Sequence, residues 1–367
     1  MKAVTWPQVL AWRMRRQFLE PAGGAPAADV PVAEVVRRLA GVQAQVASAA
    51  ALAVAVRRAG PVPGEVARAL WEERSLVKTW AARGTLHLLP AAEAPAHLAL
   101  CATARHWERP SWQRTFGATP ADLEAIAAAA RTALSGGAAL TREELTAAIV
   151  EETGSGHLAE VLGSGWGTLL KPLAWWGVLC YGPSRSTRVT FAAPERTVPG
   201  WTAPPPPEEA ARTVLPAYLG AHGPATPEAF DNWLTRKVSR KKDLKGWFAA
   251  VEDRLATVEV EGVPMQVLRE HLDELLDTPP TRSVRLVGGF DQYVLGAGTG
   301  AAYLVPAGRR AEVSRTAGWI SPVVLYEGRV AGVWAAEDGD IAVTPFEDVP
   351  SGPLAEEAAR MRALLAS

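Results

Sequence analysis

The pattern of hydrophobic and polar positions is clearest between residues 120 and 195. Apolar residues recur there at helical spacing in three stretches, and two short β-type runs joined by a tight polar turn follow them. Thr141, with Glu144 three residues later, forms a capping box that marks the start of the second helix. The expected elements are helices over 120–134, 141–150 and 164–177, a Gly- and Ser-rich turn over 153–160, and strands over 178–183 and 187–192. Three helices followed by a β-hairpin is the order of a winged helix-turn-helix.

The same order returns after a proline-rich linker at residues 197–209. Its four consecutive prolines can belong neither to a helix nor to a central strand. The second helix of this copy opens with Thr226 as N-cap and Pro227 at the first helical position. The expected elements are helices over 207–223, 225–234 and 239–251 and a hairpin over 255–268 that turns at Glu261 and Gly262.

The two ends of the chain complete the predicted fold. The first part contains four helical stretches and a β-like run, at 5–19, 30–41, 46–59, 63–73 and 84–90. The last part contains β-type segments separated by Gly turns and then a closing helix, at 282–296, 301–308, 321–334, 340–346 and 354–366. We therefore expect an α+β, mainly helical fold with three tandem winged helix-turn-helix units and a β-rich C-terminal domain. The expected domains are 1–115, 116–200, 201–280 and 281–367.

Composition indicates a soluble cytoplasmic protein. The 367 residues supply ample core for two to four domains, and two cysteines exclude a disulfide framework, which favours a reducing compartment. The longest apolar run, residues 46–56, is well short of the ~20 residues that span a bilayer. The first twenty residues carry charges where a secretory signal would keep its apolar core.

Charge is distributed unevenly along the chain. The formal net charge of -1 argues against a nucleic-acid partner when it is taken over the whole chain. Residues 1–110 carry a net charge of +6, however, and the later segments are acidic. A local basic cluster at 236–245 lies within the acidic part, where a solvated helix face is as good an interpretation as a phosphate contact.

The sequence lacks the common catalytic motifs. It contains no P-loop, no G-x-S-x-G, no H-E-x-x-H and no C-x-x-C. The GAGTG stretch at 296–300 precedes a β-like run rather than a helix, so we interpret it as a turn. The six histidines are scattered without helical ligand spacing, so we expect neither a metal nor a cofactor.

Two polar stretches are candidates for chemistry. Gln43 and Gln45 lie between a helix end marked by Gly41 and an Ala-rich helix. Their amides point the same way if the backbone is extended and roughly opposite ways if it is helical. Composition alone favours ordinary polar residues at a helix boundary. The second stretch is a predicted wing with three basic side chains, which are phosphate-contact candidates or solvated cations on an apolar strand: Lys78, Arg83 and His87.

These stretches carry a resemblance. VAEVVRRLAGVQAQ (32–45), TWAARGTLHLLP (79–90), FDQYVLG (290–296) and VVLYEGRVAGVW (323–334), in this order and spacing, resemble the winged-helix DNA glycosylase superfamily of AlkZ and YcaQ type over nearly the whole chain. The AlkZ branch carries Gln-apolar-Gln and the YcaQ branch Gln-apolar-Asp. Because Gln45 occupies the last position, the sequence resembles the AlkZ branch. The resemblance implies three tandem winged helices and a β-rich C-terminal region, in agreement with the division above.

The resemblance implies that the protein is a monofunctional DNA glycosylase that excises N7-alkylated purines from double-stranded DNA. In the AlkZ branch the substrates are bulky adducts or interstrand crosslinks made by an alkylating antibiotic, and the enzyme provides self-resistance. An N7-alkylated purine already bears positive charge, so it leaves as a neutral base with little need of a general acid. Two neutral amides can position water and stabilise an oxocarbenium-like sugar through their carbonyl dipoles. We expect Gln43 and Gln45 to do this jointly.

DNA contacts and the rival interpretations complete the expectations. A C-terminal hairpin that approaches the lesion from a groove is implied by the resemblance, and 305–319 is our candidate for it. The candidate DNA-contacting side chains are Arg13, Arg16, Lys78, Arg83, His87, Arg309, Arg310 and Arg315. The main alternative is a non-catalytic winged-helix DNA-binding protein, either a transcription regulator or a binder that sequesters the drug or shields DNA. Three non-identical units favour a monomer over the usual dimer of a regulator. A housekeeping glycosylase for simple methyl adducts would differ only in substrate.

Overall fold

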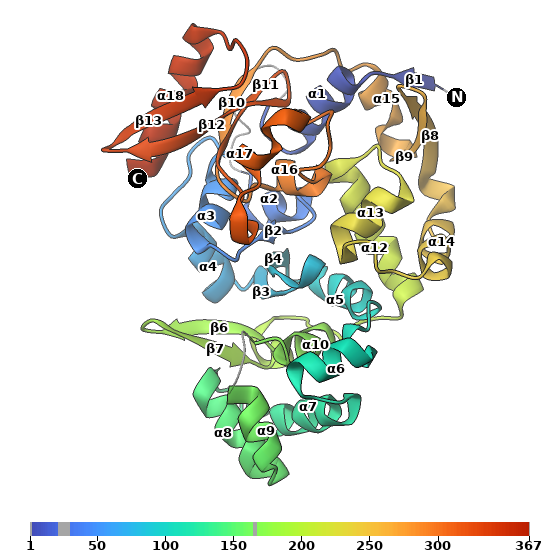
Figure 1. Cartoon of the computed structure of the whole chain (residues 1–367), viewed down its shortest axis with the longest axis vertical. Helices are drawn as coiled ribbons and strands as arrows, with labels where there is room; N and C mark the ends of the chain where they lie inside the picture. Colours follow the sequence, from blue (N-terminus) through green and yellow to red (C-terminus); the bar gives the residue numbers. More distant parts are fainter. Residues whose placement is uncertain (1, 21–29, 164–166, 367) are drawn as a thin grey trace. The chain divides into compact units, whose positions relative to one another are not determined.

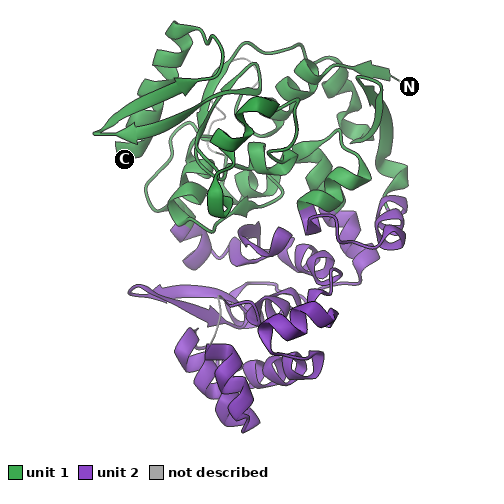
Figure 2. Ribbon diagram, in the orientation of Figure 1, with its two compact units in different colours: residues 1–66, 215–233, 251–367 green, residues 67–214, 234–250 purple. Residues whose placement is uncertain are grey.

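The computed structural model describes residues 2–20, 30–163 and 167–366 and shows an α+β fold of short helices and small sheets (Figure 1). The described chain forms two compact units (Figure 2). Unit 1 comprises residues 1–66, 215–233 and 251–367, and unit 2 comprises residues 67–214 and 234–250. Each unit is therefore assembled from segments that are distant in the sequence. The division into four consecutive domains stays a prediction.

Unit 1 contains the N-terminal helices and the C-terminal sheet. Its elements are β1 (Lys2–Val4), α1 (Trp6–Arg16), α2 (Val32–Arg38), β2 (Val42–Gln43), α3 (Ala47–Ala55), β8 (Leu255–Val260), β9 (Val263–Leu268), α15 (Leu272–Leu276), β10 (Val284–Val287), α16 (Gln292–Ala297), α17 (Arg310–Val313), β11 (Val323–Tyr326), β12 (Arg329–Glu337), β13 (Asp340–Pro345) and α18 (Ser351–Ala366). β10 to β13 form an antiparallel sheet in chain order, and β1 adds parallel to β8 at the edge of the β8–β9 hairpin.

Unit 2 contains the middle of the chain. Its elements are β3 (Leu76–Trp80), β4 (Leu86–Pro90), α5 (Ala94–Ala102), α6 (Pro110–Phe116), α7 (Pro120–Leu134), β5 (Leu140–Thr141), α8 (Arg142–Thr153), α9 (Gly156–Gly163), α10 (Leu170–Trp175), β6 (Cys180–Arg185), β7 (Arg188–Ala192), α11 (Pro194–Thr197) and α14 (Lys241–Ala249). β3 pairs with β4, and β7 pairs with both β5 and β6. Three helices run across the boundary between the units, namely α4 (Glu65–Trp71), α12 (Pro207–His222) and α13 (Pro227–Thr235).

Local signals explain why the predicted helices begin where they do. The capping box at Thr141 and Glu144 is confirmed, with the Thr141 hydroxyl accepting from the Glu144 N–H at 3.2 Å and the Glu144 carboxylate accepting from the Thr141 N–H at 2.8 Å. Thr226 accepts from the Ala229 N–H at 3.2 Å, as the N-cap prediction requires. The turn at Glu261 and Gly262 is also confirmed, because both residues have positive φ, 48° and 84°.

Four sequence predictions are wrong in detail. The turn at 153–160 is largely helix α9, whose Leu158 N–H donates to the Ser155 hydroxyl. The helix expected over 164–177 is only α10, with residues 164–166 outside the described chain. The strand expected over 282–296 ends at Val287, because the Asp291 carboxylate caps helix α16 by accepting from the Tyr293 N–H at 2.8 Å. The run expected as strand over 301–308 forms turns up to residue 306 and then enters a helical turn over 307–309. Helices α5 and α6 were not predicted.

Candidate functional site

The Gln43-Ala44-Gln45 motif lies between a strand and a helix of unit 1. Ala40 and Gly41, with φ of 55° and 99°, turn the chain after α2, and β2 then runs through Gln43. Helix α3 begins at Ala47, so the motif is not helical, and the prediction of a helix boundary is confirmed. Gln43 is buried, with 8% of its surface exposed, whereas Gln45 is exposed. The two amides therefore occupy different environments on one short segment.

Helix α3, which follows the motif, is packed onto the C-terminal core of unit 1. Val46, Ala49 and Leu52 lie against the hydrophobic cluster built from β10, β11, β12 and α18. A Cβ on Gly288 would come within 2.8 Å of Leu52 Cδ2, so a larger residue there would push the Leu52 side chain out of its present position. The motif is thus carried by an element whose position depends on residues almost 240 positions away in the sequence.

A buried ion pair attaches the end of α3 to α16. The Arg57 guanidinium donates to both Asp291 carboxylate oxygens at 2.7 Å, and both side chains are fully buried. Arg57 also donates to the backbone oxygens of Gln17 and Ala53 at 3.0 and 2.6 Å. Because a buried guanidinium must find acceptors for its N–H groups, this network holds one arrangement of α1, α3 and α16.

A second cluster of polar groups surrounds a cavity of about 230 Å³ in unit 2. Arg83, His106 and Arg236 line this cavity. A Cβ on Gly84, which also lines it, would lie 3.8 Å from Lys171 Nζ. Burial and the neighbouring Arg236 lower the pKa of Lys171, and burial, Arg109, Lys171 and Arg236 lower the pKa of His106. A site rich in cations of this kind suits an anionic group such as a phosphate.

Comparison with known proteins decides the family. A family model described as DNA glycosylase AlkZ-like matches residues 36–366. The chain belongs to this AlkZ-like DNA glycosylase family. It is 48% identical over 355 residues to an interstrand DNA cross-link repair glycosylase of Streptomyces sahachiroi, which covers 96% of this chain and 94% of the relative. The solved structure of the Streptomyces sahachiroi DNA glycosylase AlkZ matches with a TM-score of 0.93 at 47% identity, over 99% of this chain and 97% of that one.

Within this AlkZ-like chain, the candidate DNA contacts on α1 are engaged by the protein itself. Arg13 is buried, and its guanidinium donates to the backbone oxygens of Gly223 and Pro224 at 3.0 and 3.1 Å. Arg16 is half-buried, donates to the Gly220 oxygen and lies 3.6 Å from the Glu274 carboxylate. These two side chains therefore hold α1 against α12, the segment that follows it, and α15. The partners are more than 200 positions away in the sequence, so sequence patterns could not predict these contacts.

The three candidate residues of the β3–β4 hairpin differ in what they can do. Arg83 sits at the turn with φ of 58° and lines the cavity in unit 2. Lys78 Nζ lies 5.6 Å from the ring centroid of Tyr181, and burial lowers the pKa of Lys78. His87 is buried, with its Nδ1 3.0 Å from the Thr85 oxygen. Burial lowers the pKa of His87 to about 3, so it cannot serve as a cation at neutral pH.

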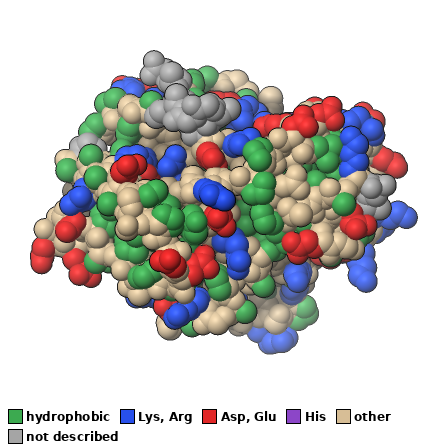
Figure 3. All heavy atoms as spheres, turned by 90° about the horizontal axis from the view of Figure 1, so that it is seen from above, with side chains coloured by type: hydrophobic (Ala, Val, Ile, Leu, Met, Phe, Trp, Pro, Cys, Tyr) green, Lys and Arg blue, Asp and Glu red, His purple; other side chains and the backbone are tan. Residues whose placement is uncertain are grey.

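The C-terminal candidates lie on a segment that is not the predicted hairpin. Residues 307–309 form a helical turn that runs into α17, so the hairpin expected over 305–319 is wrong. Arg309 pairs with Glu312 at 3.0 Å, as helical i,i+3 spacing permits, whereas Arg310 and Arg315 are exposed. The face drawn in Figure 3 carries cationic and anionic side chains interspersed, so charge alone singles out no DNA-binding surface there.

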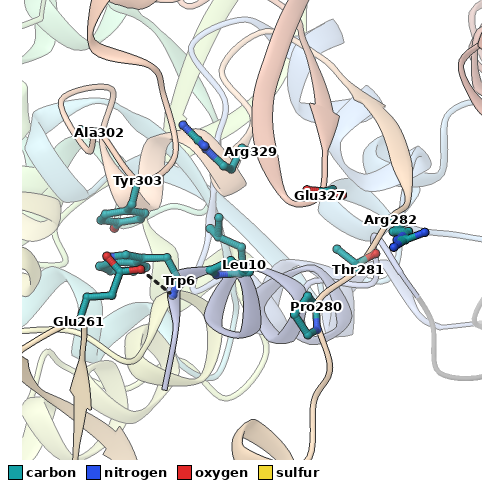
Figure 4. Close-up of a pocket in the computed structure, with 11 residues that line it drawn as sticks. Trp6, Leu10, Glu261, Pro280, Thr281, Arg282, Ala302, Tyr303, Glu327 and Arg329 are labelled. Carbon is teal, nitrogen blue, oxygen red and sulfur yellow. Dashed lines mark hydrogen bonds between the residues drawn. The ribbon is translucent and has the colours of Figure 1, made fainter. Parts of the chain in front are cut away.

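A further cavity in unit 1 lies apart from the predicted residues. It has a volume of about 810 Å³ and lies beside the stacked rings of Trp6 and Tyr303, whose centroids are 3.5 Å apart (Figure 4). Glu261, which also lines it, accepts a hydrogen bond from the Trp6 N–H. No candidate site residue from the sequence lines this cavity in the described chain.

No described helix has the length and apolar character needed to cross a membrane.

Acidification is expected to destabilise the protein through two buried histidines. Burial lowers the pKa of His87 to about 3 and that of His97 to about 4. The unfolded chain takes up protons near pH 6.5 and the folded chain does not, so the free energy of unfolding falls as pH drops below about 6.5. At pH 5 the expected loss is ~2 kcal/mol per histidine. Urea unfolding at pH 7 and pH 5 measures this, and a His87→Gln variant with an unchanged pH dependence would contradict it.

Proposed function

We propose that this protein is a monofunctional DNA glycosylase that hydrolyses the N-glycosidic bond of N7-alkylated purines in double-stranded DNA. We include bulky adducts and interstrand crosslinks made by a DNA-alkylating antibiotic, with self-resistance as the biological role. The observation that carries the proposal is the Gln43-Ala44-Gln45 motif, with one amide buried and one exposed, on a segment fastened to the core of an AlkZ-like chain.

The two amides suit this chemistry without a proton donor. Alkylation at N7 makes the purine a cation, so cleavage of the glycosidic bond releases a neutral base and leaves positive charge on the sugar. Gln45 is exposed and has access to solvent water, which its carbonyl can orient toward the sugar. Gln43 is buried, and a dipole held in a low-dielectric environment stabilises developing charge more strongly than one in water. Two neutral amides give too little help to cleave the glycosidic bond of an undamaged nucleotide, whose base is a poor leaving group. The enzyme therefore selects alkylated purines by their reactivity.

We assign the nucleophile to water. A bifunctional glycosylase needs an amine nucleophile that forms a Schiff base with the sugar. The roles proposed for Gln43 and Gln45 need only a water molecule beside the sugar.

We further propose that three winged helices hold the duplex and that a monomer acts on one lesion in the cytoplasm. The three helix-rich segments each end in a hairpin along the chain, β3–β4, β6–β7 and β8–β9. In unit 2, the cavity beside Arg83, Lys171 and Arg236 is our candidate phosphate contact. In unit 1, the exposed Arg310 and Arg315 are the remaining candidates.

Three duplexes test the proposal: one with a single N7-methylguanine, one with an N7–N7 interstrand crosslink, and one undamaged. We expect free modified base from the first two, detected by mass spectrometry and corrected for spontaneous loss without protein. The strands should stay intact until alkali cleaves the abasic sites. Strand cleavage with a borohydride-trapped covalent complex would overturn the monofunctional assignment. No release together with tight sequence-specific binding to the undamaged duplex would favour a transcription regulator.

A further inference from the structure

Trp319 differs from the other tryptophans of the chain. The other described tryptophans are buried or half-buried, as in a hydrophobic core, and Trp319 alone among those described is exposed, with 48% of its surface accessible. An exposed aromatic side chain of this size loses the stabilisation that burying its apolar surface would contribute. Its exposure therefore points to a partner that covers the ring.

The loop that presents Trp319 is short and closed. Ser314 and Ile320 form a β-bridge, and the Arg315 N–H donates to the Trp319 oxygen at 2.8 Å. Ala317 and Gly318 between them have φ of 58° and 76°, so a non-glycine residue is held in the left-handed region at the tip. The Trp319 ring meets Phe290 edge to face at 5.0 Å, and about half of the Trp319 surface stays accessible.

Arg315 flanks the same cavity as Trp319. The cavity measures about 470 Å³ and is walled by Trp334 and by alanines of β12 and β13, with Glu337 as its acidic member. Arg315 is exposed, at the start of the loop, and Trp319 is at its end. An aromatic ring and a guanidinium on one cavity of mixed polarity match a nucleobase and its phosphate, because the base can stack on the ring and the phosphate can accept hydrogen bonds from the guanidinium.

The loop shares its support with the glutamine motif. Phe290, which contacts Trp319, lies between Gly288, which touches Leu52 of α3, and Asp291, which pairs with Arg57. Segment 288–291 therefore contacts both the loop that carries Trp319 and the region of α3, and it connects the two within unit 1. A group bound by the loop and a group bound by the motif would therefore both be held by unit 1.

We propose that Trp319 stacks on a DNA base that is displaced from the helical stack next to the lesion, with Arg315 on the adjoining phosphate. This inference rests on the proposed function and adds a base-contacting residue to it. Such a contact holds open a duplex whose crosslinked base cannot rotate out, since the stacked base is a neighbour of the lesion. It also accounts for a surface tryptophan on a closed loop.

The test uses the full chain and a duplex with 2-aminopurine next to one N7-methylguanine, because 2-aminopurine fluoresces when it leaves the stack. Trp319→Ala should lower kcat/KM for base release by about 10- to 100-fold and abolish the fluorescence increase on binding. Trp319→Phe should retain most of both signals. Leu365→Ala, which trims an exposed apolar side chain of α18 in the same unit, is the matched control and should change neither. Thermal unfolding checks that each variant is folded.

The outcomes separate this inference from the proposed function. Normal release and normal fluorescence in folded Trp319→Ala would overturn the stacking contact and leave the glycosylase proposal standing. A wild-type chain that releases no base would overturn the proposed function, and the fluorescence arm would still decide whether Trp319 contacts a base. Equal loss in Trp319→Ala and Trp319→Phe, with an unchanged fluorescence increase on binding, would assign Trp319 to packing against Phe290 and overturn the inference.

Discussion

Replacing Gln43 or Gln45 by alanine is expected to lower the rate of base release by about 100- to 1000-fold. Each amide is proposed to act on charge or water in the transition state, and removal of one such group has an effect of this size in other enzymes. The double variant should fall by less than the product of the two single effects, since both groups serve one water and one sugar. Single-turnover release of N7-methylguanine from a duplex measures all three.

Two further variants make this result specific. Gln266→Ala removes an amide from β9, where it bonds to Thr257 near 3.3 Å, and should leave the rate unchanged. Gln45→Asp replaces the exposed amide by a carboxylate, which can act as a general base toward water, and should retain release of the methylated base. Gln43 is buried, so its alanine variant also needs a folding check by thermal unfolding. Release at the wild-type rate by a folded double variant would show that the motif is not catalytic.

Asp291→Ala is expected to lower the free energy of unfolding by about 3–5 kcal/mol. The substitution leaves the Arg57 guanidinium buried without its counter-charge, and it also removes the N-cap of α16. Denaturant unfolding followed by far-UV circular dichroism measures the change. Because α3 follows the glutamine motif and ends beside Arg57, base release should fall in the same variant.

The control for Asp291 is an ion pair of similar length at the surface. Glu270→Ala breaks the bridge to Arg254 at 2.8 Å, in which both side chains are about half exposed, and should change stability by less than ~1 kcal/mol. A joint Arg57→Met and Asp291→Leu variant removes both buried charges and should recover part of the lost stability. A loss below ~1 kcal/mol in Asp291→Ala would show that the buried pair does not hold α3 to α16.

Much of the secondary structure could be predicted because its causes are local. Capping boxes, proline at helix starts and the Glu261–Gly262 turn each involve residues within four positions of one another. Segment 290–296 was misassigned although its helix signal is local. Its aromatic and β-branched residues favour a strand, but the Asp291 carboxylate caps a helix by accepting from the Tyr293 N–H two residues later. Only the pairing of that carboxylate with Arg57, 234 positions away, lies beyond local sequence signals.

The candidate site likewise combines features that can be found in the sequence with features that only the folded structure reveals. The glutamine motif could be found in the sequence because it is contiguous and lies in a chain that resembles the AlkZ branch. The buried positions of Arg13 and His87, and the exposure of Trp319, could not be found, since basic residues are usually on the surface and tryptophans usually inside. Residue type alone predicts that Arg13 and His87 are exposed and that Trp319 is buried, and the structure shows the opposite for all three.

The sequence by itself determined the order of helices and hairpins, the position of the Gln43-Ala44-Gln45 motif and the family resemblance. Only the tertiary structure decided which polar groups are buried, which cations stay available to a ligand and which residues support the motif. The physical reason is that burial and pairing depend on neighbours brought together from distant segments. Arg57 and Asp291 stabilise α3 only because the folded chain removes both from water at the same place.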